Sequence, residues 1–592
     1  MKLLNWFNYR FLKTTKTENE NIDDSSRIEP QKSKQTRFLR QQTLYFWFIF
    51  IMLLPCMALA LTEPMSVWVR IASVMLPMAV YVLLFNLFRK PGYFLIICFI
   101  LLLINGYQLV LIYLFNESVV SPDMFLNIVT TDAGESGELM RTIWPAVLLA
   151  CILYFSATAL GIYSIINKRK LPVSFTKQSC IYALIPAIIG LGSLLINHAK
   201  GFPFRLDHDI YPVNALYNLN FATHKLIRTV NYPETSKDFT FNAVKEETSS
   251  QREVYVLVVG ETSRAANWQL YGYGRQTNPL LSQRDDVVVF KDVLSQGNTT
   301  HKIVPMILSS ACAEDFNRVY VQKSLITAFK EAGFQTAYIS NQIRDRAFID
   351  AFASEADTTI RISEEEGDDR HRYDNEALPY ISKMVNESDH PLLIVFHTYG
   401  SHFEYSQRYA PENALFTPDK AGALRYKERP VFLNAYDNTI CNVDRLLNGI
   451  IQILEDANVC SSMMYLSDHG EDLMDDERKM FLHCSPVPTY YQLHIPLLMW
   501  FSEEYKNAFP INYNAAVNNR LQPASTNAVF HTMLDLSRIN TFYKDETYSL
   551  VNESFEVRKR YFIDEHDEPE DFFTIGLKKQ DWEMIEKMKI KI

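Results

Sequence analysis

The chain has 592 residues, of which 48% are hydrophobic and 21% charged, and its formal net charge is −10 at pH 7. This length leaves room for more than one domain, because single domains usually run to about 100–200 residues. No acidic or basic block dominates and no basic stripe is present, so the sequence does not favour a nucleic acid as a partner.

The front of the chain contains five long apolar segments. They are Thr43 to Leu61, about Val67 to Phe88, Tyr93 to Phe115, Trp144 to Ile166 and Ser179 to Asn197. Each approaches or exceeds the roughly 20 residues that cross the hydrocarbon core of a bilayer. We therefore predict a five-helix transmembrane domain over residues 43–198, after a tail over residues 1–42. The long polar tail before the first segment argues against a cleaved signal peptide.

Basic residues in the short loops indicate the orientation of this domain. They are Lys13, Lys16, Lys32, Lys34, Arg37 and Arg40 in the tail, Arg89 and Lys90 in the second-to-third loop, and Lys168, Arg169 and Lys170 in the fourth-to-fifth loop. Such residues favour the cytoplasmic side of a membrane. With an odd number of spans, everything after Asn197 lies on the far side, which is the periplasm if the chain resides in a bacterial inner membrane.

The exported part begins with residues 199–250, which are polar and interrupted by prolines and are predicted to be a linker with a short helix near Asn214 to Val230. The predicted strands after it are Val254–Val259, Val287–Phe290, Thr336–Ile339, Leu392–Phe396, Met463–Leu466 and Ile495–Trp500. The predicted helices are Ser324–Ala332, Glu376–Val385 and Asn438–Glu455. Strands that alternate with helices predict an α/β domain over residues 251–592, with a parallel sheet covered on both faces. The charged segment from Asn540 is either a peripheral helix or partly disordered.

Half of the eight cysteines fall in or beside the apolar segments, where they are most simply packing residues. The exported part contains Cys312, Cys441, Cys460 and Cys484. These residues allow at most two disulfides, and their spacing does not assign a pairing.

Polar residues that follow three of the predicted strands are candidates for a site. Glu261 follows the first strand, His402 follows "HTYGS", and Asp468 and His469 lie in "YLSDHGED". In open α/β sheets, functional groups collect outside the carboxyl ends of strands. Two carboxylates and an imidazole form a ligand set that suits zinc or a similar divalent ion.

A metal at this edge would need a group to activate, and "SQGNTTHKIVPMILSS" offers two threonines. A threonine hydroxyl is a poor nucleophile near neutral pH, and coordination to a dication increases its acidity. Thr299 and Thr300 both precede an apolar helical pattern, so either could instead be only a helix cap.

The motifs "GETSRAANWQLYGYGRQTNPLL", "SLITAFKEAGFQTAYISNQ", "HTYGSHFEYSQRYAP", "AYDNTI", "YLSDHGED" and "FLH" resemble, in this order, the signatures of the lipid A phosphoethanolamine transferases. This family includes the mobile colistin-resistance enzymes, which confer polymyxin resistance. The resemblance covers nearly the whole chain, including the five spans. It implies an alkaline-phosphatase-like, sulfatase-like catalytic domain that forms a phosphoethanolamine–threonine intermediate at zinc.

The resemblance also assigns roles to individual residues. It implies that Thr300 is the nucleophile and that Glu261, Asp468 and His469 bind Zn²⁺ together with the Thr300 oxygen. Thr262 then becomes a supporting residue. His402 and the His of "FLH", His483, correspond to active-site histidines of the family, which could bind substrate phosphate, donate protons or hold a second zinc.

A further resemblance lies in "DMFLNIVTTDAGESGEL", within a predicted periplasmic helix near residues 121–140. The family pattern of Asn, Thr and Glu at four-residue steps matches Asn127, Thr131 and Glu135, and such spacing places all three on one helix face. The resemblance implies that this face holds the ethanolamine head group, although the pattern also fits the polar face of a surface helix.

The chain departs from the family at several positions. Gln296 and Met306 stand where the family carries cysteines, which puts the usual disulfide set in doubt. Asn298 replaces a usual threonine. The family's lysine near the "NQ" motif is not obvious, although Arg344 and Arg346 are close in sequence. We expect these differences to affect which acceptor the protein uses more than which donor it uses.

The function that the resemblance implies is transfer of phosphoethanolamine from phosphatidylethanolamine to lipid A or the lipopolysaccharide core. A phosphoglycerol transferase or a sulfatase-like phosphodiester hydrolase is the alternative, although Thr300 lacks a sulfatase-type C/S-x-P-x-R context and Glu135 favours a cationic head group. A non-enzymatic, membrane-tethered lipid sensor would not need a nucleophile beside a metal. The acceptor, the number of zinc ions and the oligomeric state remain open.

Overall fold

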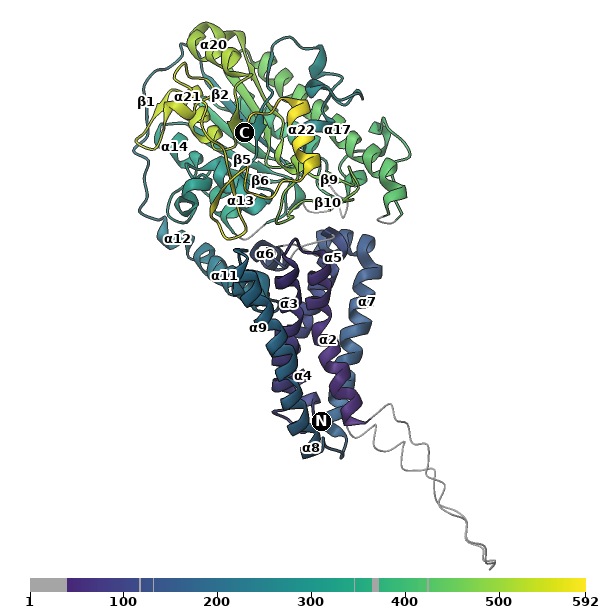
Figure 1. Ribbon diagram of the computed structural model, residues 1–592. Coiled ribbons are helices and arrows are strands. Elements are labelled where there is room, and N and C mark those ends of the chain that lie inside the picture. The colour runs from purple at the N-terminus through teal and green to yellow at the C-terminus, as the bar shows by residue number, and fades with distance from the viewer. Residues whose placement is uncertain (1–39, 116–118, 131–132, 345–346, 365–371, 423–424) are drawn as a thin grey trace, which may run out of the picture.

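A computed structural model describes residues 40–115, 119–130, 133–344, 347–364, 372–422 and 425–592. Figure 1 shows a helical bundle built from the front of the chain and an α/β domain placed at one end of it. Helices α6 and α11 lie at the junction between the two parts (Figure 1).

The bundle is built from long apolar helices. They are α2 (Gln41–Thr62), α3 (Val67–Phe85), α4 (Gly92–Ile97), α5 (Phe99–Phe115), α7 (Ala133–Ile166), α8 (Val173–Tyr182) and α9 (Leu184–Ala199). Among the described residues, four helical stretches are long and apolar enough to cross a membrane, namely those over residues 41–62, 67–85, 143–166 and 173–199. The third predicted span is divided at Cys98 into α4 and α5, because the backbone of Cys98 leaves the helical region with φ −83° and ψ 22°.

Several polar side chains inside the bundle are paired with one another or with backbone carbonyls. Ser164 donates a hydrogen bond of 2.6 Å to the Gln41 side chain, which ties the start of α2 to the end of α7. Tyr211 donates one of 2.6 Å to Asn105, which ties the segment after the bundle to α5. These long-range bonds fix the register of helices that apolar packing alone would let slide.

Further helices lie at the junction between the bundle and the α/β domain (Figure 1), where α6 comes between α5 and α7 in the chain and the others form the connector. They are α6 (Pro122–Thr130), α10 (Leu206–Asp209), α11 (Val213–Val230) and α12 (Tyr232–Thr235). The helix predicted near Asn214 to Val230 is therefore present as α11. The Asn218 side chain on α11 donates a hydrogen bond of 2.9 Å to the carbonyl of Val120, directly before α6.

A seven-stranded sheet forms the centre of the α/β domain, in the order β3-β11-β8-β2-β7-β5-β6. The strands are β2 (Glu253–Gly260), β3 (Val287–Phe290), β5 (Gln335–Ser340), β6 (Thr358–Arg361), β7 (Leu392–His397), β8 (Cys460–Ser467) and β11 (Leu497–Phe501). All six predicted strands are present, and β6 is additional. The sheet is mixed and not wholly parallel, since β11 runs antiparallel to both of its neighbours. The chain after β8 stays at the carboxyl end of that strand, so β11 begins at this end of the sheet and runs in the opposite direction.

Helices cover both faces of the sheet, as predicted. They include α14 (Leu325–Glu331), α16 (Leu378–Glu387), α17 (Arg429–Ala457) and α21 (Ala528–Leu536). Alternate residues of β2 belong to two different cores: Tyr255, Leu257 and Val259 on one face and Val254, Val256 and Val258 on the other. This two-sided burial explains why β2 is apolar along almost its whole length.

The remaining elements lie around the sheet. They are β1 (Val244–Lys245), β4 (Val293–Leu294), α13 (Thr300–Leu308), α15 (Phe348–Ala353), β9 (Asp472–Leu473), β10 (Phe481–Leu482), α18 (Tyr490–Leu493), α19 (Glu503–Ala508), α20 (Pro510–Asn519), β12 (Ala524–Ser525), β13 (Ile539–Asn540), β14 (Tyr561–Ile563), β15 (Pro569–Asp571) and α22 (Lys579–Met588). The charged C-terminal segment thus forms a β-hairpin and a peripheral helix, whose Phe562, Phe572 and Ile585 pack against Tyr490. All eight cysteines lie in the described part of the chain, and each carries a free thiol.

Candidate active site

Residues that follow two neighbouring strands, β2 and β8, meet at the carboxyl edge of the sheet. Because β2 lies between β8 and β7 and runs parallel to both, Glu261 after β2 comes next to Asp468 and His469 after β8. All three side chains are buried, and their possible ligand atoms lie within 4.8 Å of one another. The structure thus brings together the three residues that the sequence indicated as metal ligands.

Thr262 holds two of these residues in place. Its hydroxyl donates a hydrogen bond of 2.7 Å to Oε1 of Glu261, and its backbone N–H donates one of 3.1 Å to Oδ1 of Asp468. Its φ of 60° lies in the left-handed region, which is costly for a β-branched residue. A hydrogen bond of 2.7 Å from the Tyr436 hydroxyl to its carbonyl helps to maintain this conformation.

Gly400 allows a second loop to approach the same point. Its φ is +52°, and a Cβ at this position would come within 2.6 Å of the Glu261 carbonyl. Ser401, the next residue, donates a backbone hydrogen bond of 2.9 Å to that carbonyl. The glycine of "HTYGSH" therefore lets the loop that carries His402 lie against Glu261.

Of the two candidate threonines, Thr300 points into the cluster. It is the first residue of α13, and its Oγ1 lies 3.1 and 3.2 Å from the two carboxylate oxygens of Glu261 and 3.2 Å from Nε2 of His469. Thr299 is the N-cap residue, yet its side chain makes no capping hydrogen bond, and its hydroxyl has no hydrogen-bond partner among the described residues. The position of Thr300 at a helix N-terminus also favours binding of an anion there.

The donor atoms of this cluster fit a divalent cation. Oδ2 of Asp468 is buried and accepts no hydrogen bond within the described part of the chain, which is costly for a carboxylate oxygen unless a cation lies nearby. The Gly470 carbonyl can only accept, so Nδ1 of His469 donates across 2.9 Å and Nε2 presents a lone pair. Burial lowers the pKa of His469, which keeps the ring neutral and able to bind a metal.

His402 and His483 lie beside the cluster, as the sequence indicated. The ring centre of His483 is 4.3 Å from that of His469 and 6.2 Å from that of His402. Burial lowers the pKa of His483 to about 4, and burial together with Arg408 holds the pKa of His402 well below its usual value. Both rings are therefore neutral near pH 7.

Two residues near the cluster were not singled out in the sequence. The Gln342 side-chain amide donates a hydrogen bond of 3.3 Å to Oε2 of Glu261. The Glu471 carboxyl lies 3.3 Å from Nδ1 of His483, and burial raises its pKa to about 8. Gln342 directly follows the "SN" that ends the β5 segment, so the strand-end rule that found Glu261 also applies to it.

Of the two sequence candidates for the family's lysine, Arg344 and Arg346, only Arg344 is among the described residues. Arg344 is exposed and pairs with Glu364 across 2.7 Å. Arg346 lies outside the described residues.

The candidate head-group residues are placed only in part. Asn127 lies in α6, and its side-chain amide is 3.8 Å from Sγ of Cys484, next to His483. Thr131 lies outside the described residues, and so does the side chain of Glu135, whose backbone belongs to α7. A common face for the three residues therefore stays a prediction.

An apolar groove leads from the histidines into the helical bundle. It is a cavity of about 540 Å³, and His402, His483, Cys484 and Asn127 lie at one end of it. Most of the remaining lining is apolar and comes from α5, α6 and α7, including Leu103, Gly106, Leu111, Val147, Cys151 and Phe155. Leu103 and Phe155 are 48% and 57% exposed, so the groove is open along the outside of the bundle.

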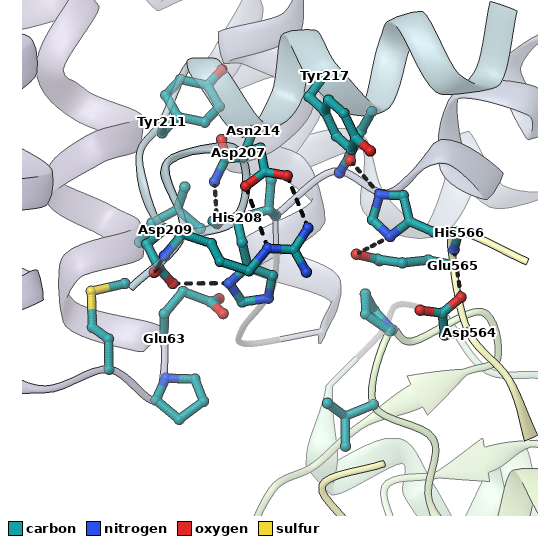
Figure 2. Close-up of a pocket in the computed structure, with 18 of the residues that line it drawn as sticks. Glu63, Asp207, His208, Asp209, Tyr211, Asn214, Tyr217, Asp564, Glu565 and His566 are labelled. Atoms are coloured by element: carbon teal, nitrogen blue, oxygen red, sulfur yellow. Dashed lines mark hydrogen bonds and ion pairs between the residues drawn. The ribbon is translucent and has the colours of Figure 1, made fainter. Parts of the chain in front are cut away.

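A second cavity, of about 350 Å³, lies at the other side of the loop that follows His483. Figure 2 shows Asp564, Glu565 and His566 facing Asp207, His208 and Asp209 across it. Several of its polar groups are paired with one another, as in the ion pair between Arg205 and Asp207 at 2.9 Å. This cavity is polar and rich in carboxylates, so it differs in character from the groove.

Comparisons of the sequence and of the structure with known proteins point to the same group of relatives. The sulfatase family model matches residues 253–539. The phosphoethanolamine transferase EptA of Escherichia coli (strain K12) is 26% identical over 446 residues, which are 72% of this chain and 79% of that protein. The crystal structure of the C-terminal periplasmic domain of EcEptC from Escherichia coli in complex with Zn is 26% identical, with a TM-score of 0.52, and covers 58% of this chain and 98% of that one.

A full-length relative shows the arrangement of both parts. The integral membrane protein lipooligosaccharide phosphoethanolamine transferase A (EptA) from Neisseria meningitidis matches with a TM-score of 0.68 at 24% identity, over 87% of this chain and 98% of that one. A helical bundle with stretches long and apolar enough to cross a membrane, followed by a sulfatase-like domain, is therefore the fold of this chain. The resemblance seen in the sequence is confirmed as homology.

Proposed function

This chain is a homologue of the phosphoethanolamine transferases with a sulfatase-family domain, and from that premise we propose that it transfers phosphoethanolamine from phosphatidylethanolamine to lipid A or the lipopolysaccharide core. The observation that carries the proposal is the position of Thr300 Oγ1, which lies within 3.2 Å of both Glu261 and His469 at the start of a helix. A hydroxyl placed in this way suits a nucleophile that is used in a group transfer.

In the first step, the Thr300 oxygen attacks the phosphorus of the donor lipid. A bond forms between Oγ1 and phosphorus, and the bond from phosphorus to the diacylglycerol oxygen breaks. The proton lost by Thr300 is balanced by the proton that diacylglycerol takes up as it leaves. The product on the protein is a phosphoethanolamine ester of Thr300.

The residues that would hold a zinc ion are Glu261, Asp468 and His469, with Thr300 beside them. When bound, Zn²⁺ would act as a Lewis acid that makes the Thr300 hydroxyl more acidic and offsets negative charge on the phosphate. Thr262 keeps the two carboxylates oriented through its two hydrogen bonds.

In the second step, an acceptor oxygen attacks the same phosphorus and releases Thr300. The acceptor loses a proton and the Thr300 oxygen regains one as it is released. His402 and His483, whose rings lie beside the cluster, are the residues that we propose to carry this proton. Nδ1 of His402 lies 2.6 Å from the Phe403 carbonyl and donates to it, so Nε2 is the nitrogen that can accept.

The apolar groove supports a diacyl lipid as the donor. Its polar end lies at His402 and His483, and its apolar lining extends along the bundle, which matches a lipid with its phosphate at the nucleophile and its acyl chains in the groove. We assign the ethanolamine ammonium to the face of Asn127, Thr131 and Glu135, because a carboxylate beside an ammonium forms a charge-assisted hydrogen bond.

This reaction also requires a particular topology. We propose that residues 1–42 are cytoplasmic, that residues 43–198 cross a bacterial inner membrane five times with α4 and α5 together as the third crossing, and that the catalytic domain over residues 251–592 lies in the periplasm. Residues 199–250 link the two parts. The basic loops and the four long apolar helices support this arrangement.

Mass spectrometry of lipid A and core oligosaccharide, from cells with and without the gene, tests the proposed function. We expect an added phosphoethanolamine group on one of the two, and its position identifies the acceptor. Addition of phosphoglycerol, or unchanged lipid A and core together with phosphodiester hydrolysis by the purified protein, would contradict it.

A further inference from the structure

A buried cluster of charges lies directly behind the nucleophile, and no step of the proposed reaction uses it. Nζ of Lys302 lies 2.6 Å from Oδ2 of Asp123 and 3.2 Å from Oδ1 of Asp567. Nζ of Lys225 lies 3.3 Å from Oδ1 of Asp123 and 2.6 Å from Oδ1 of Asp567. These four residues, Asp123, Lys225, Lys302 and Asp567, are called the interdomain cluster below.

The members of the cluster come from four separate parts of the chain. Asp123 is in the first turn of α6, which lies against the bundle, and Lys225 is on α11 of the connector. Lys302 is on α13, two residues after Thr300. Asp567 is in the turn between β14 and β15. The cluster therefore joins the membrane-associated part to the nucleophile helix.

Its charges balance one another out of contact with water. The four side chains are between 2% and 14% exposed, and two acids face two bases. Although burial alone would raise it, the ammonium groups of Lys225 and Lys302 hold the pKa of Asp123 well below its usual value. His301, directly after Thr300, places Nε2 3.1 Å from Oδ1 of the same carboxylate. Asp123 is thus held by both residues that follow the nucleophile.

Neighbouring contacts keep the turn that carries Asp567 seated on the connector. Nε2 of His566 lies 3.0 Å from Oδ1 of Asn218 on α11, and its ring centre is 5.6 Å from that of Tyr217 and 5.2 Å from that of Phe221. Figure 2 shows His566 and Tyr217 close together on this side of the polar cavity. The domain contact is thus continuous from Asp123 to Tyr217.

On helix α6, the face that carries Asp123 also carries Asn127, which lines one end of the groove. Asn127 is four residues after Asp123, so the two side chains lie on one side of the helix. Asn127 contacts Cys484 and lines the groove next to His483. A carboxylate that anchors α6 to α13 therefore also fixes the distance between the groove and Thr300.

We propose that Asp123 is a positioning residue, which locks α6 and the groove mouth against the nucleophile helix through Lys302 and Lys225. The inference rests on the proposed function. Its consequence is that the phosphate of a lipid held in the groove reaches Thr300. A small soluble substrate reaches Thr300 without the groove, so it depends much less on the lock.

The test compares two substrates with the full-length protein in phospholipid vesicles. Asp123→Asn and Lys302→Met should each lower kcat/KM for transfer from phosphatidylethanolamine at least tenfold. The loss for hydrolysis of bis(4-nitrophenyl) phosphate should be at least fivefold smaller. Since both changes break the same contact between Asp123 and Lys302, kcat/KM for lipid transfer in the double variant should be no lower than in the more strongly affected single variant.

A matched control is available in an exposed ion pair. Lys237 lies 3.2 Å from Glu234, and both side chains are more than half exposed. Lys237→Met removes an ammonium group in the same way as Lys302→Met, and both rates should stay at the wild-type level. A parallel fall for the two substrates in Asp123→Asn, or losses that multiply in the double variant, would overturn the proposal.

Hydrogen exchange provides a readout that does not need turnover. In Asp123→Asn, deuterium uptake should rise in peptides from α6, while peptides from β2 and β8 keep the wild-type uptake. Unchanged uptake in α6 would overturn the lock. A wild-type protein that transfers no phosphoethanolamine would contradict the proposed function alone, because the exchange result still decides the role of Asp123.

Discussion

The backbone N–H of Thr262 donates a hydrogen bond of 3.1 Å to Oδ1 of Asp468, and so joins the ends of two neighbouring strands. Because the Thr262 hydroxyl is also bonded to Glu261, this residue orients both carboxylates of the cluster. Thr300, in contrast, presents its hydroxyl to Glu261 and His469 from a helix on the other side of the site. The two threonines therefore have separable roles.

The first prediction concerns the covalent intermediate. After incubation with phosphatidylethanolamine and no acceptor, peptide mass spectrometry should find phosphoethanolamine on the peptide that contains Thr300. Thr300→Ala should abolish this addition and the transfer activity. Thr262→Ala should lower the rate, because the carboxylates lose an orienting hydrogen bond, but it should leave the modified residue unchanged. A modified Thr262, or full transfer by Thr300→Ala, would refute the assignment.

The second prediction concerns metal content. The protein purified without chelator should contain zinc, and dialysis against a chelator should remove both the zinc and the activity. Asp468→Asn removes one carboxylate charge and should lower the zinc content measured by elemental analysis at least tenfold. Asp374→Asn offers a comparison, since Asp374 is also buried but accepts hydrogen bonds from Tyr399 and Gly400 instead. Equal zinc in wild type and Asp468→Asn would exclude this residue as a ligand.

The third prediction concerns the donor head group. Glu135→Ala should lower transfer from phosphatidylethanolamine far more than hydrolysis of a small soluble phosphodiester, because only the lipid carries an ammonium group for the carboxylate. Glu135→Gln should behave like Glu135→Ala, since both variants lose the charge. Equal losses on the two substrates would mean that Glu135 supports folding and not donor binding.

The fourth prediction concerns reduction. The four cysteines of the α/β domain carry free thiols in the structure, and Cys441 and Cys460 are buried. A phosphine reductant such as tris(2-carboxyethyl)phosphine should therefore change neither the melting temperature nor the rate by more than the experimental error. A protein whose exported domain unfolds under mild reduction would show that disulfides stabilise it after all.

The fifth prediction concerns pH. Asp472 is buried and accepts hydrogen bonds from Thr489 and Gln492, at 2.6 and 2.5 Å. Burial raises its pKa to about 7, so the folded state keeps this proton while the unfolded chain loses it near pH 4. The stabilisation from this group is present below pH 4 and is lost as the pH rises to 7, by on the order of 4 kcal/mol.

Asp472→Asn removes this titration, because an amide can still bond to Thr489 and Gln492 but has no acidic proton. The melting temperature of the full-length variant should therefore fall less between pH 4 and pH 7 than that of the wild type. Parallel melting curves over this range would show that Asp472 is ionised in the folded protein.

Much of the site could be predicted because it follows from local patterns. β2 is apolar along its length since both of its faces are buried, and the polar residue at its end is then conspicuous. The same rule indicated Asp468, His469 and His402. The strand β6 was missed because Thr358–Arg361 is only half-buried and has no apolar run.

Other features depend on contacts that leave no trace in the sequence. The antiparallel direction of β11 follows from the path of the chain after β8. The break at Cys98 lies within an unbroken apolar run. Asp123 and Lys302 are 179 positions apart, and each looks like an ordinary surface charge until the fold brings them together.

The open side of the groove has a kinetic consequence. A donor that enters between helices arrives by lateral diffusion within the membrane leaflet, so the quantity that sets the rate is its mole fraction among the surrounding lipids. Diluting the vesicles with buffer should therefore leave turnover unchanged, whereas adding an inert lipid or detergent to the same bilayer should slow it. In the proposed reaction, the membrane is the solvent in which the donor lipid is dissolved.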